Sequence, residues 1–449
     1  MSETLKHDKN TSEEQDLKEA VHSFEQSHVI IGQRVEKSEE NPHGFKHVFS
    51  VPPDKPAVLF FGGTGTEVDK GSDKSANGYL SHLETYLKKS GIEKILKEQT
   101  NTTDIKKALG LYSIIYDFGK TIDGGISCEK DLARGTLFAK HKQIWSPVRF
   151  KIINNKIYRF LFDDEREFRE MQNKEYAKSG SSFRYSLVAD VEDINPETLK
   201  PNYIDELFNN VFLSRICDEN GKKLPIEEAC KRVRNVTVCA HCHGAYTFLK
   251  IEEKMQQKMM EVGYSNEERA KIQSQLLCVA LSPDAPLGVS KSTMISFISS
   301  FDIRLIGIYN YNNFKEEIKE MTRVRKEKIE PSYFPGKKGE FFLIHKIYDS
   351  SDWLDGADGE HNLLNSSQSE PMSEDGKILF EFAANAITNG IKSSLEKTPL
   401  PSIEELVCGQ SEKDKSLFQT FKKNGEELWA KMKKNITASL SARYKQKTY

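Results

Sequence analysis

Residues Asn235–Leu249 read NVTVCAHCHGAYTFL, and this stretch decides the expected fold. Its first half is a short apolar, β-branched run, which is typical of a buried parallel strand. The next residues, Ala240-His-Cys-His-Gly244, follow the pattern small-x-nucleophile-x-Gly, with cysteine at the nucleophile position. Small residues two positions before and after the nucleophile leave room for a sharp turn from strand to helix. The pattern predicts a nucleophile at Cys242, at the N-terminus of a helix that begins near Ala245.

A helix N-terminus favours negative charge, so this position favours the thiolate form of a cysteine. Two other interpretations of the same residues are open. In the first, the cysteines are inert thiols of a core strand. In the second, zinc is bound by Cys239, His241, Cys242 and His243. The zinc interpretation is disfavoured, because four ligands within five residues of a strand cannot converge on a tetrahedral centre and no Cys-x-x-Cys pair occurs elsewhere. We therefore expect no metal and no cofactor.

Length, charge and composition limit the class of protein. The chain has 449 residues, a hydrophobic content of 37% and a formal net charge of -2. Such a chain can bury a large core, so we expect one large domain with additions, or two domains. Its charge balance gives no general attraction for phosphate backbones, so nucleic acid is not an expected partner.

Cysteine usage and the lack of long apolar runs bear on location. Seven scattered cysteines are typical of a protein in a reducing cytosol. Without a long apolar run or a signal-peptide pattern, we expect a soluble protein. If it is secreted into a host or target cell, it leaves by a route that needs no cleaved signal peptide.

Apolar runs that alternate with helical patterns predict an α/β fold, a doubly wound and mainly parallel sheet. The expected strands, besides the one before Cys242, are Ala57–Phe61, Leu109–Phe118, Leu276–Leu281, Ile303–Tyr309 and Phe341–Ile347.

Changes in composition divide the chain into regions. The polar, charged segment 1–45 is expected to be a mobile N-terminal arm, within which Ser23–Gln33 can form a short strand or helix. Residues 46–400 are the expected catalytic domain. Apolar residues alternate like a hairpin within an insertion or cap at about 138–190.

A glycine-rich turn, Gly62-Gly-Thr-Gly-Thr66, follows the expected strand Ala57–Phe61. Backbone N–H groups in such a turn are free to approach an anion. The turn lacks both the Gly-Lys-Ser/Thr of a P-loop and the GxGxxG spacing, so an oxyanion loop is favoured over a phosphate-binding loop. The expected oxyanion hole is formed by the backbone N–H groups of His243 and of Gly63 or Thr64.

Enzymes with a nucleophile elbow take their catalytic residues in the chain order nucleophile, acid, histidine. Asp284 is the expected acid, because it lies just past the strand Leu276–Leu281. The rival acids are Asp302, Asp349 and Asp352.

His361 is the expected base, because it lies in a glycine- and acid-rich loop after the last expected strand. His345 lies in that strand and is more typical of a core residue. His241 and His243 flank the sulfur, but each is more typical of packing or hydrogen bonding.

Together these motifs resemble a bacterial α/β-hydrolase family of uncharacterised-domain proteins related to type VI secretion phospholipase effectors. The family signatures are approximately F-D-G-T-x-N after the first strand, G-F-S-R-G-A-Y at the elbow, Asp-Thr after the next strand and a late W-x-x-G-x-H-S-D-V-G-G loop. The matching segments are Phe61–Thr66, Ala240–Tyr246, Ser282–Asp284 and Trp353–His361.

The chain departs from these signatures at three points. Gly62 stands where the family has aspartate, Cys242 replaces the serine, and no Val-Gly-Gly follows His361. The resemblance, which spans roughly Ala57 to Gly390, implies an α/β-hydrolase fold and a bacterial effector that hydrolyses lipid esters.

The residues themselves predict acyl transfer to water. Cys242 attacks a carbonyl carbon, His361 transfers the proton and Asp284 orients His361. The expected substrate is an ester, a thioester or a lipid. Because a thiolate also attacks amides, a cysteine protease or deamidase that acts on a protein is an alternative. A catalytically inactive α/β-hydrolase-like binding scaffold is a second one.

The tail 401–449 is expected to be basic, amphipathic and helical. Residues Ser411–Tyr449 contain ten Lys/Arg and four Asp/Glu, and apolar residues recur there at helical spacing. Two short helices, broken at Asn424-Gly425, are expected. In the favoured interpretation the apolar faces dock on the catalytic domain. In the other, the tail binds an anionic membrane surface.

Overall fold

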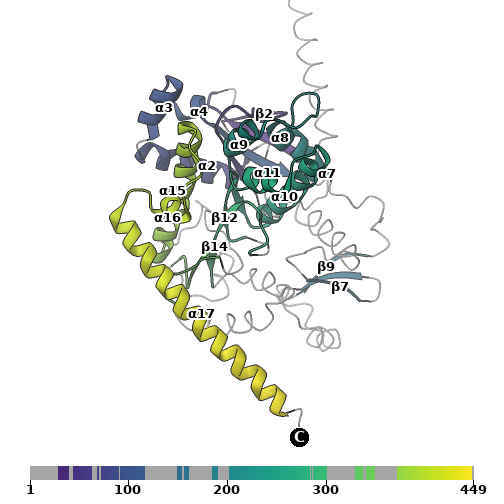
Figure 1. Cartoon of the computed structure of the whole chain (residues 1–449), viewed down its shortest axis with the longest axis vertical. Helices are drawn as coiled ribbons and strands as arrows, with labels where there is room; N and C mark the ends of the chain where they lie inside the picture. Colours follow the sequence, from purple (N-terminus) through teal and green to yellow (C-terminus); the bar gives the residue numbers. More distant parts are fainter. Residues whose placement is uncertain are drawn as a thin grey trace, which may run out of the picture.

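The computed structural model describes residues 29–39, 44–62, 68–69, 72–90, 92–116, 149–153, 156–160, 185–190, 202–283, 285, 287–300, 329–336, 340–348 and 372–446. Within these residues the central element is a nine-stranded sheet of order β13-β14-β12-β11-β10-β3-β6-β1-β2 (Figure 1). Its members are β1 (Val29–Arg34), β2 (Phe45–Val48), β3 (Ala57–Phe61), β6 (Gly110–Tyr116), β10 (Val236–His241), β11 (Leu277–Leu281), β12 (Thr293–Ser299), β13 (Ser332–Phe334) and β14 (Glu340–Ile344).

Parallel pairing dominates the middle of this sheet. The neighbours β6, β3, β10, β11, β12 and β14 all pair in parallel, and antiparallel pairs occur only at the two edges, in β1 with β2 and β6 and in β13 with β14. The protein is therefore α/β with a mostly parallel sheet, as the alternation of apolar runs predicted.

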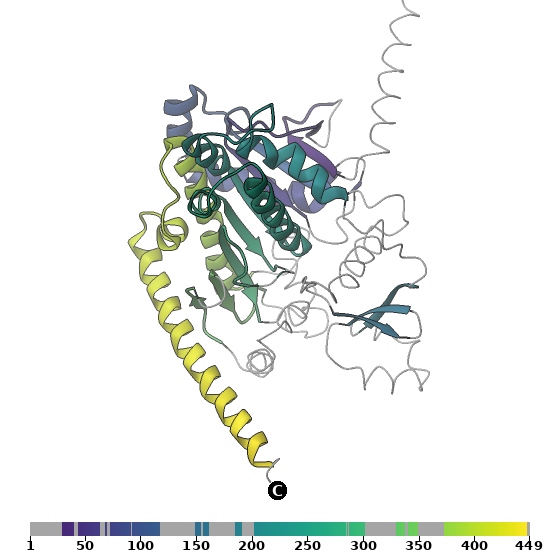
Figure 2. The same cartoon turned by 45° about the vertical axis from the view of Figure 1, so that its right-hand side comes forward.

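Helices cover both faces of the sheet (Figures 1 and 2). One face packs against α7 (Asn202–Leu207), the π-helix η4 (Phe208–Phe212), α8 (Leu213–Ile216), α9 (Ile226–Arg234), α10 (His243–Glu261) and α11 (Asn266–Gln273). The other face packs against α2 (Lys74–Lys89), α3 (Ile92–Thr100), α4 (Ile105–Ala108), α15 (Glu374–Glu396), α16 (Ile403–Cys408) and α17 (Glu412–Gln446).

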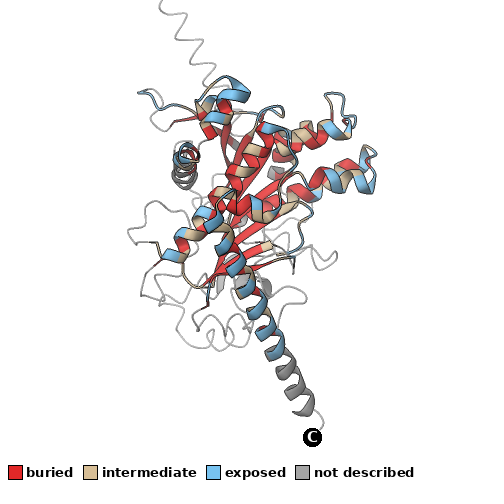
Figure 3. Cartoon of the chain, turned by 60° about the vertical axis from the view of Figure 1, so that its left-hand side comes forward, coloured by how far each residue is buried: buried red, intermediate tan, exposed pale blue. Residues whose placement is uncertain are grey.

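The central strands are buried on both sides, which Figure 3 shows as red strands between the helix layers. In β3 all five residues are buried, with Leu59 and Phe61 in one core and Val58 and Phe60 in the other. Successive side chains of a strand point to opposite faces, so a strand covered on both faces needs a continuous apolar run. Full burial of each such side chain stabilises the fold by about 1.5–3 kcal/mol.

Two smaller sheets lie outside the nine-stranded one. Strands β4 (Val68–Asp69) and β5 (Ser72–Asp73) form a short hairpin. Strands β7 (Arg149–Ile153), β8 (Lys156–Phe160) and β9 (Tyr185–Asp190) form an antiparallel sheet between β6 and α7 in the sequence. The alternating segment at 138–190 therefore contains the expected hairpin, in a sheet separate from the main one.

Several strands of the sheet differ from those expected from the sequence. Val29–Arg34 overlaps Ser23–Gln33, the part of the arm for which a short strand or helix was expected, and it is β1, which pairs with β2 and β6. The neighbour of β11 is β12, Thr293–Ser299, whereas the expected strand Ile303–Tyr309 lies outside the described residues. The edge strand β13, which pairs antiparallel with β14, is not among the expected strands either.

The predicted helix break at Asn424-Gly425 is wrong, because α17 runs unbroken from Glu412 to Gln446. Asn424 Nδ2 donates a hydrogen bond to the carbonyl of Pro331, 2.9 Å away. A Cβ at Gly425 would lie 1.9 Å from the carbonyl oxygen of Tyr333. The Asn-Gly pair lets α17 approach the edge strand β13 closely.

Among the described residues, no helix has both the length and the apolar content to cross a bilayer.

Candidate functional site

The candidate site lies at the carboxyl end of β10, in the centre of the sheet. Strand β10 pairs in parallel with β3 on one side and with β11 on the other. The next strand of this sheet after β3 in the sequence is β6, which lies on one side of the β10–β3 pair. The next strand after β10 is β11, which lies on the other side. In open α/β sheets, ligands bind beyond the carboxyl ends of the strands, at the point where the strand order reverses. That point is the space between the ends of β3 and β10.

Cys242 occupies the turn between β10 and α10. Its backbone angles are φ 51° and ψ -122°, and it is the N-cap residue of α10. A positive φ at a residue other than glycine is uncommon, and such strain costs about 1–3 kcal/mol. Strained conformations of this kind cluster at active sites and ligand clamps. The predicted nucleophile thus stands at one of four described non-glycine positions with positive φ.

The small residues around Cys242 have a direct packing reason. A Cβ added at Gly244 would lie 2.2 Å from the carbonyl oxygen of Phe61, the last residue of β3. Ala240 is fully buried and pairs with Phe61 across the ladder. A larger side chain at Gly244 would push α10 away from β3, so this glycine sets the position of the turn.

The N-terminus of α10 supplies backbone donors next to the sulfur. His243 is the first residue of α10, and the first N–H groups of a helix have no partner within that helix. Aligned peptide dipoles place partial positive charge at the same end. A developing negative charge beside Cys242 would therefore meet both the helix dipole and the His243 N–H.

The glycine-rich segment Gly62–Thr66 begins close to the Cys242 turn, and only its first residue is described. Phe61 is level with Ala240 in the ladder, and Gly62, which follows directly, is buried. Gly63 and Thr64, the other expected oxyanion residues, lie outside the described residues.

The end of β11 has a second strained turn, which sequence reasoning missed. Ser282 is fully buried with φ 43°, and its N–H donates to the carbonyl of Phe297 at 2.9 Å. The Cys242 N–H donates to the carbonyl of Leu281 at 3.2 Å, so the two turns are hydrogen-bonded neighbours. Asp284, two residues beyond Ser282, lies outside the described residues. No pattern in the Ser-Pro-Asp segment distinguishes a strained serine from an ordinary turn.

Glu252 is a second residue that the sequence analysis did not single out. It lies on α10 and is buried, and its Oε1 accepts hydrogen bonds from Ser290 Oγ at 2.9 Å, from the Lys291 N–H at 2.8 Å and from the Ser292 N–H at 2.5 Å. These bonds tie α10 to the connection between β11 and β12. The only sequence signal for this contact is the position of the glutamate, which follows Ile251 on the apolar side of the helix.

The described histidines do not include the expected base, since His361 and the rival acids Asp302, Asp349 and Asp352 lie outside the described residues. His345 directly follows β14, and its Nδ1 lies 3.5 Å from Ser300 Oγ. Strand β14 is three positions from β10 in the sheet, which corresponds to about 14 Å. A side chain held at the end of β14 is therefore too far away to bond to the sulfur of Cys242.

The other cysteines have a different environment. The described cysteines form no disulfide with one another, and all of them are buried. Burial raises the pKa of the thiols of Cys217, Cys230 and Cys278, and it raises the pKa of Cys408 to about 12. These thiols stay protonated and unreactive near neutral pH. Of the described residues, no group of three or more His, Cys, Asp or Glu is arranged to hold a metal ion.

A pocket of about 390 Å³ lies at the amino ends of β12 and β14. Its lining includes Thr293 and Glu340, the first residues of β12 and β14. The amino ends of parallel strands lie at the opposite end of the sheet from their carboxyl ends, so this pocket is separate from the turn at Cys242.

No family model and no curated protein sequence matches the chain.

Proposed function

We propose that the protein is a hydrolase that uses Cys242 as the nucleophile of an acyl transfer to water. The observation that carries this proposal is the backbone of Cys242, which is held at φ 51° between a central parallel strand and the N-terminus of a long helix. Packing alone does not require a cysteine at this turn, since glycine adopts positive φ without the steric strain that a side chain causes there.

The proposal extends to an α/β-hydrolase-like fold. Its supports are the mostly parallel sheet, the turn at the end of a central strand and the close approach of Gly244 to β3. The separate sheet β7-β8-β9, inserted between β6 and α7, is the proposed cap. The likeness of the motifs to the phospholipase effector family is part of the same proposal.

The proposed base and acid are His361 and Asp284. Asp284 follows the turn at Ser282, which is hydrogen-bonded to the Cys242 turn through neighbouring strands. His361 lies thirteen residues beyond Tyr348, where the described residues after β14 end. Thirteen residues can span up to roughly 43 Å, which is ample to cover the distance of about 14 Å from β14 to β10.

The chemistry balances without a cofactor. His361 accepts the thiol proton as Cys242 Sγ bonds to the substrate carbonyl carbon, and the His243 N–H and the Gly62–Thr66 turn stabilise the oxyanion. Collapse of this intermediate breaks the bond to the leaving group, which takes the proton from His361. Water then attacks the carbonyl carbon of the enzyme thioester and gives one proton to His361. The C–S bond breaks, the carboxylic acid is released, and the sulfur takes the proton back from His361 to regenerate the thiol.

The test compares wild type with Cys242→Ala on acyl esters, acyl thioesters and protein amides. The matched control is Cys278→Ala, which removes a buried thiol from the adjacent strand β11. We expect hydrolysis of an ester or thioester by wild type and by the control, and a loss of at least about 10³-fold in Cys242→Ala. Equal turnover by wild type and Cys242→Ala would refute the proposal.

The same panel separates the alternatives. Cleavage of a protein, or release of ammonia from its side-chain amides, identifies a protease or deamidase that uses the same thiol. If no substrate turns over and a small electrophile labels Cys242 no faster than the other cysteines, the binding-scaffold interpretation replaces the enzyme.

A further inference from the structure

Helix α17 consists of two parts with different charge. The first part, Glu412–Glu427, has four acidic residues and four lysines, which are Glu412, Asp414, Glu426, Glu427, Lys413, Lys415, Lys422 and Lys423. The second part, Leu428–Gln446, has five basic residues and no acidic one. These are Lys431, Lys433, Lys434, Arg443 and Lys445. We call the second part the basic half of α17.

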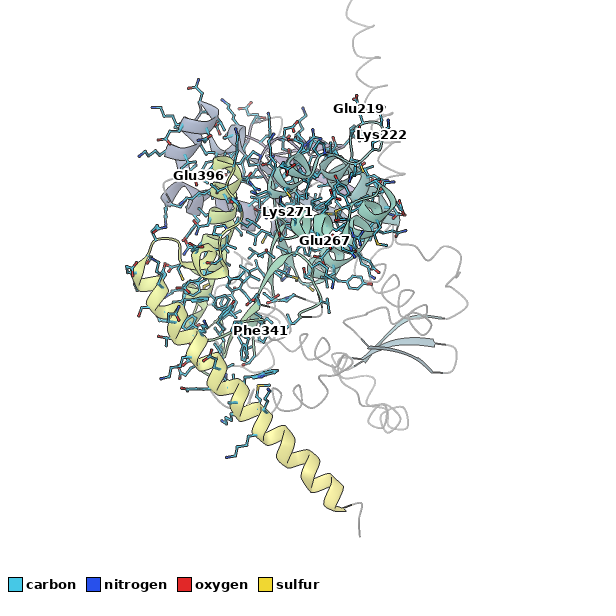
Figure 4. The ribbon with its side chains drawn as sticks, viewed as in Figure 1. Glu219, Lys222, Glu267, Lys271, Phe341 and Glu396 are labelled. Carbon is cyan, nitrogen blue, oxygen red and sulfur yellow. The ribbon has the colours of Figure 1, made fainter. Side chains whose placement is uncertain are left out.

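The charge-balanced part docks on the domain. Phe418 and Phe421 are buried in the core on that face of the sheet, and Gly425 lies against the carbonyl of Tyr333. At the junction, Leu428 and Trp429 pack against the cluster that contains Phe341, which Figure 4 labels beside the helix. The favoured interpretation of the tail, docking through its apolar face, therefore holds for the first part.

The basic half continues beyond this contact. Lys431, Lys433 and Lys434 are exposed, whereas Met432 between them is buried. In both Figure 1 and Figure 2 the helix extends past the strands to the C-terminal end of the chain. The basic half therefore begins against the domain, where Met432 is buried, and continues from there as one helix to Gln446.

Apolar positions recur along the basic half. Ile436, Leu440 and Tyr444 are spaced four residues apart, so these positions follow one side of the helix. Lys431, Lys434 and Lys445 lie on the opposite side of the helix from this row. Lys433 and Arg443 lie beside the row itself. A helix of low overall hydrophobicity that carries basic residues around a row of apolar positions is typical of a segment that lies in the interface of a membrane.

We propose that the basic half of α17 binds an anionic lipid surface. Lysine and arginine are attracted to anionic headgroups, and the apolar positions enter the boundary between headgroups and acyl chains. A nucleic acid would use the same charges but offers no partner for a row of Ile, Leu and Tyr. For this reason lipid is the favoured ligand. The proposal is independent of the reaction at Cys242.

The test measures co-sedimentation of the full-length protein with vesicles at 0.15 M salt, an ionic strength at which surface charges are screened beyond about 8 Å. One vesicle contains phosphatidylcholine alone, and the other contains phosphatidylcholine with about 30% phosphatidylserine. We expect at least tenfold stronger binding to the second vesicle. The variant Lys434→Gln/Arg443→Gln/Lys445→Gln should lose that preference by about tenfold or more.

Two further variants make the test specific. The control Lys94→Gln/Lys97→Gln/Lys413→Gln removes the same charge from exposed positions on α3 and the docked part of α17, and should bind within about twofold of wild type. The variant Ile436→Ser/Leu440→Ser should weaken vesicle binding severalfold. Circular dichroism melting of each variant checks that the domain is folded.

Three outcomes would overturn the proposal. The first is equal binding of wild type to both vesicles. The second is the same loss in the control as in the basic-half variant. The third is full vesicle binding by Ile436→Ser/Leu440→Ser together with retention of a DNA duplex by wild type, which would show that the basic half binds polyanions through charge alone.

Discussion

The backbone of Gly244 in α10 lies against the carbonyl oxygen of Phe61 at the end of β3, so closely that a Cβ at Gly244 would fall 2.2 Å from that oxygen. This contact joins the Cys242 turn to the strand that the glycine-rich segment follows in the sequence. The oxygen of Phe61 belongs to the backbone, so it cannot move aside as the end of a flexible side chain would.

Gly244→Ala should lower the free energy of unfolding by about 2 kcal/mol or more, because the added methyl group must displace α10 or β3. It should also slow the reaction of Cys242 with iodoacetamide, since the turn moves with the helix. Urea unfolding and mass-spectrometric labelling measure the two effects.

Gly425→Ala is the matched control for that variant. Its Cβ would lie 1.9 Å from the carbonyl oxygen of Tyr333, again a backbone atom, but the contact is between α17 and the edge strand β13. It should destabilise the protein to a similar extent and leave labelling of Cys242 unchanged. If both variants slow labelling equally, the Gly244 contact has no specific role at the turn.

Replacing Cys242 by glycine or alanine separates strain from chemistry. At an ordinary position glycine is the less stable of the two by about 0.5–1 kcal/mol. At φ 51° alanine keeps the strain and glycine removes it. We therefore expect Cys242→Gly to be more stable than Cys242→Ala by about 1 kcal/mol, with neither hydrolysing substrate.

The comparison site for this pair is Ala245, on the first turn of α10. There, Ala245→Gly should be destabilising by about 1 kcal/mol. Thermal and urea unfolding of the three variants checks the order. A glycine at 242 that is less stable than alanine would mean that the turn carries no strain.

Several elements could be predicted because the apolar pattern and the residues that begin and end the element indicate the same structure. The strand Ala57–Phe61 has the predicted bounds, since prolines precede a continuous apolar run and glycines follow it. The turn at Cys242 could be predicted from the small residues Ala240 and Gly244. A strand-to-helix turn that packs closely against β3 needs small residues at these two positions. The roles of Asp284 and His361 stay predictions.

Other elements depend on tertiary contacts that leave weak local signals. Strand β12, TMISFIS, places two serines among its apolar residues, so its pattern is less continuous than that of β3 or β11. Val29–Arg34 is short and follows a polar segment, and its partner β6 lies about 80 residues away in sequence, at Gly110–Tyr116. Gly425 was taken for a helix break because, in sequence, a glycine that permits close approach is indistinguishable from one that ends a helix.

Labelling should distinguish Cys242 from the other cysteines. Cys408 is buried to the same degree as Cys242, with 3% and 4% exposure, but only Cys242 lies at a helix N-terminus. Burial raises the pKa of Cys408 to about 12, so its thiolate stays scarce up to about pH 9. We expect iodoacetamide at pH 7.5 to modify Cys242 at least about tenfold faster than Cys408. Equal rates would remove the support for a reactive thiol.

The last prediction concerns the edge strand β1 and its pH dependence. Arg34 on β1 bonds through Nε to Glu84 Oε2 on α2 at 3.2 Å, and both side chains are about nine-tenths buried. Burial alone would raise the pKa of Glu84, but hydrogen bonds from Lys88 and Arg34 and the charges of Lys106 and Arg34 hold it below its ordinary value of 4.5.

A carboxyl group whose pKa is lowered by folding stabilises the folded state above its unfolded pKa, and this contribution is lost as the pH falls through its folded pKa. Glu84→Gln removes the buried carboxylate that pairs with Arg34, Lys88 and Lys106, so it should cost about 3 kcal/mol at pH 7. The difference from wild type should shrink steadily below about pH 4.5. Glu98→Gln, at an exposed position on α3, should stay within about 0.5 kcal/mol of wild type. Urea unfolding from pH 7 to pH 3 measures all three proteins, and a Glu84→Gln deficit that does not change with pH would show that the ion pair does not tether β1.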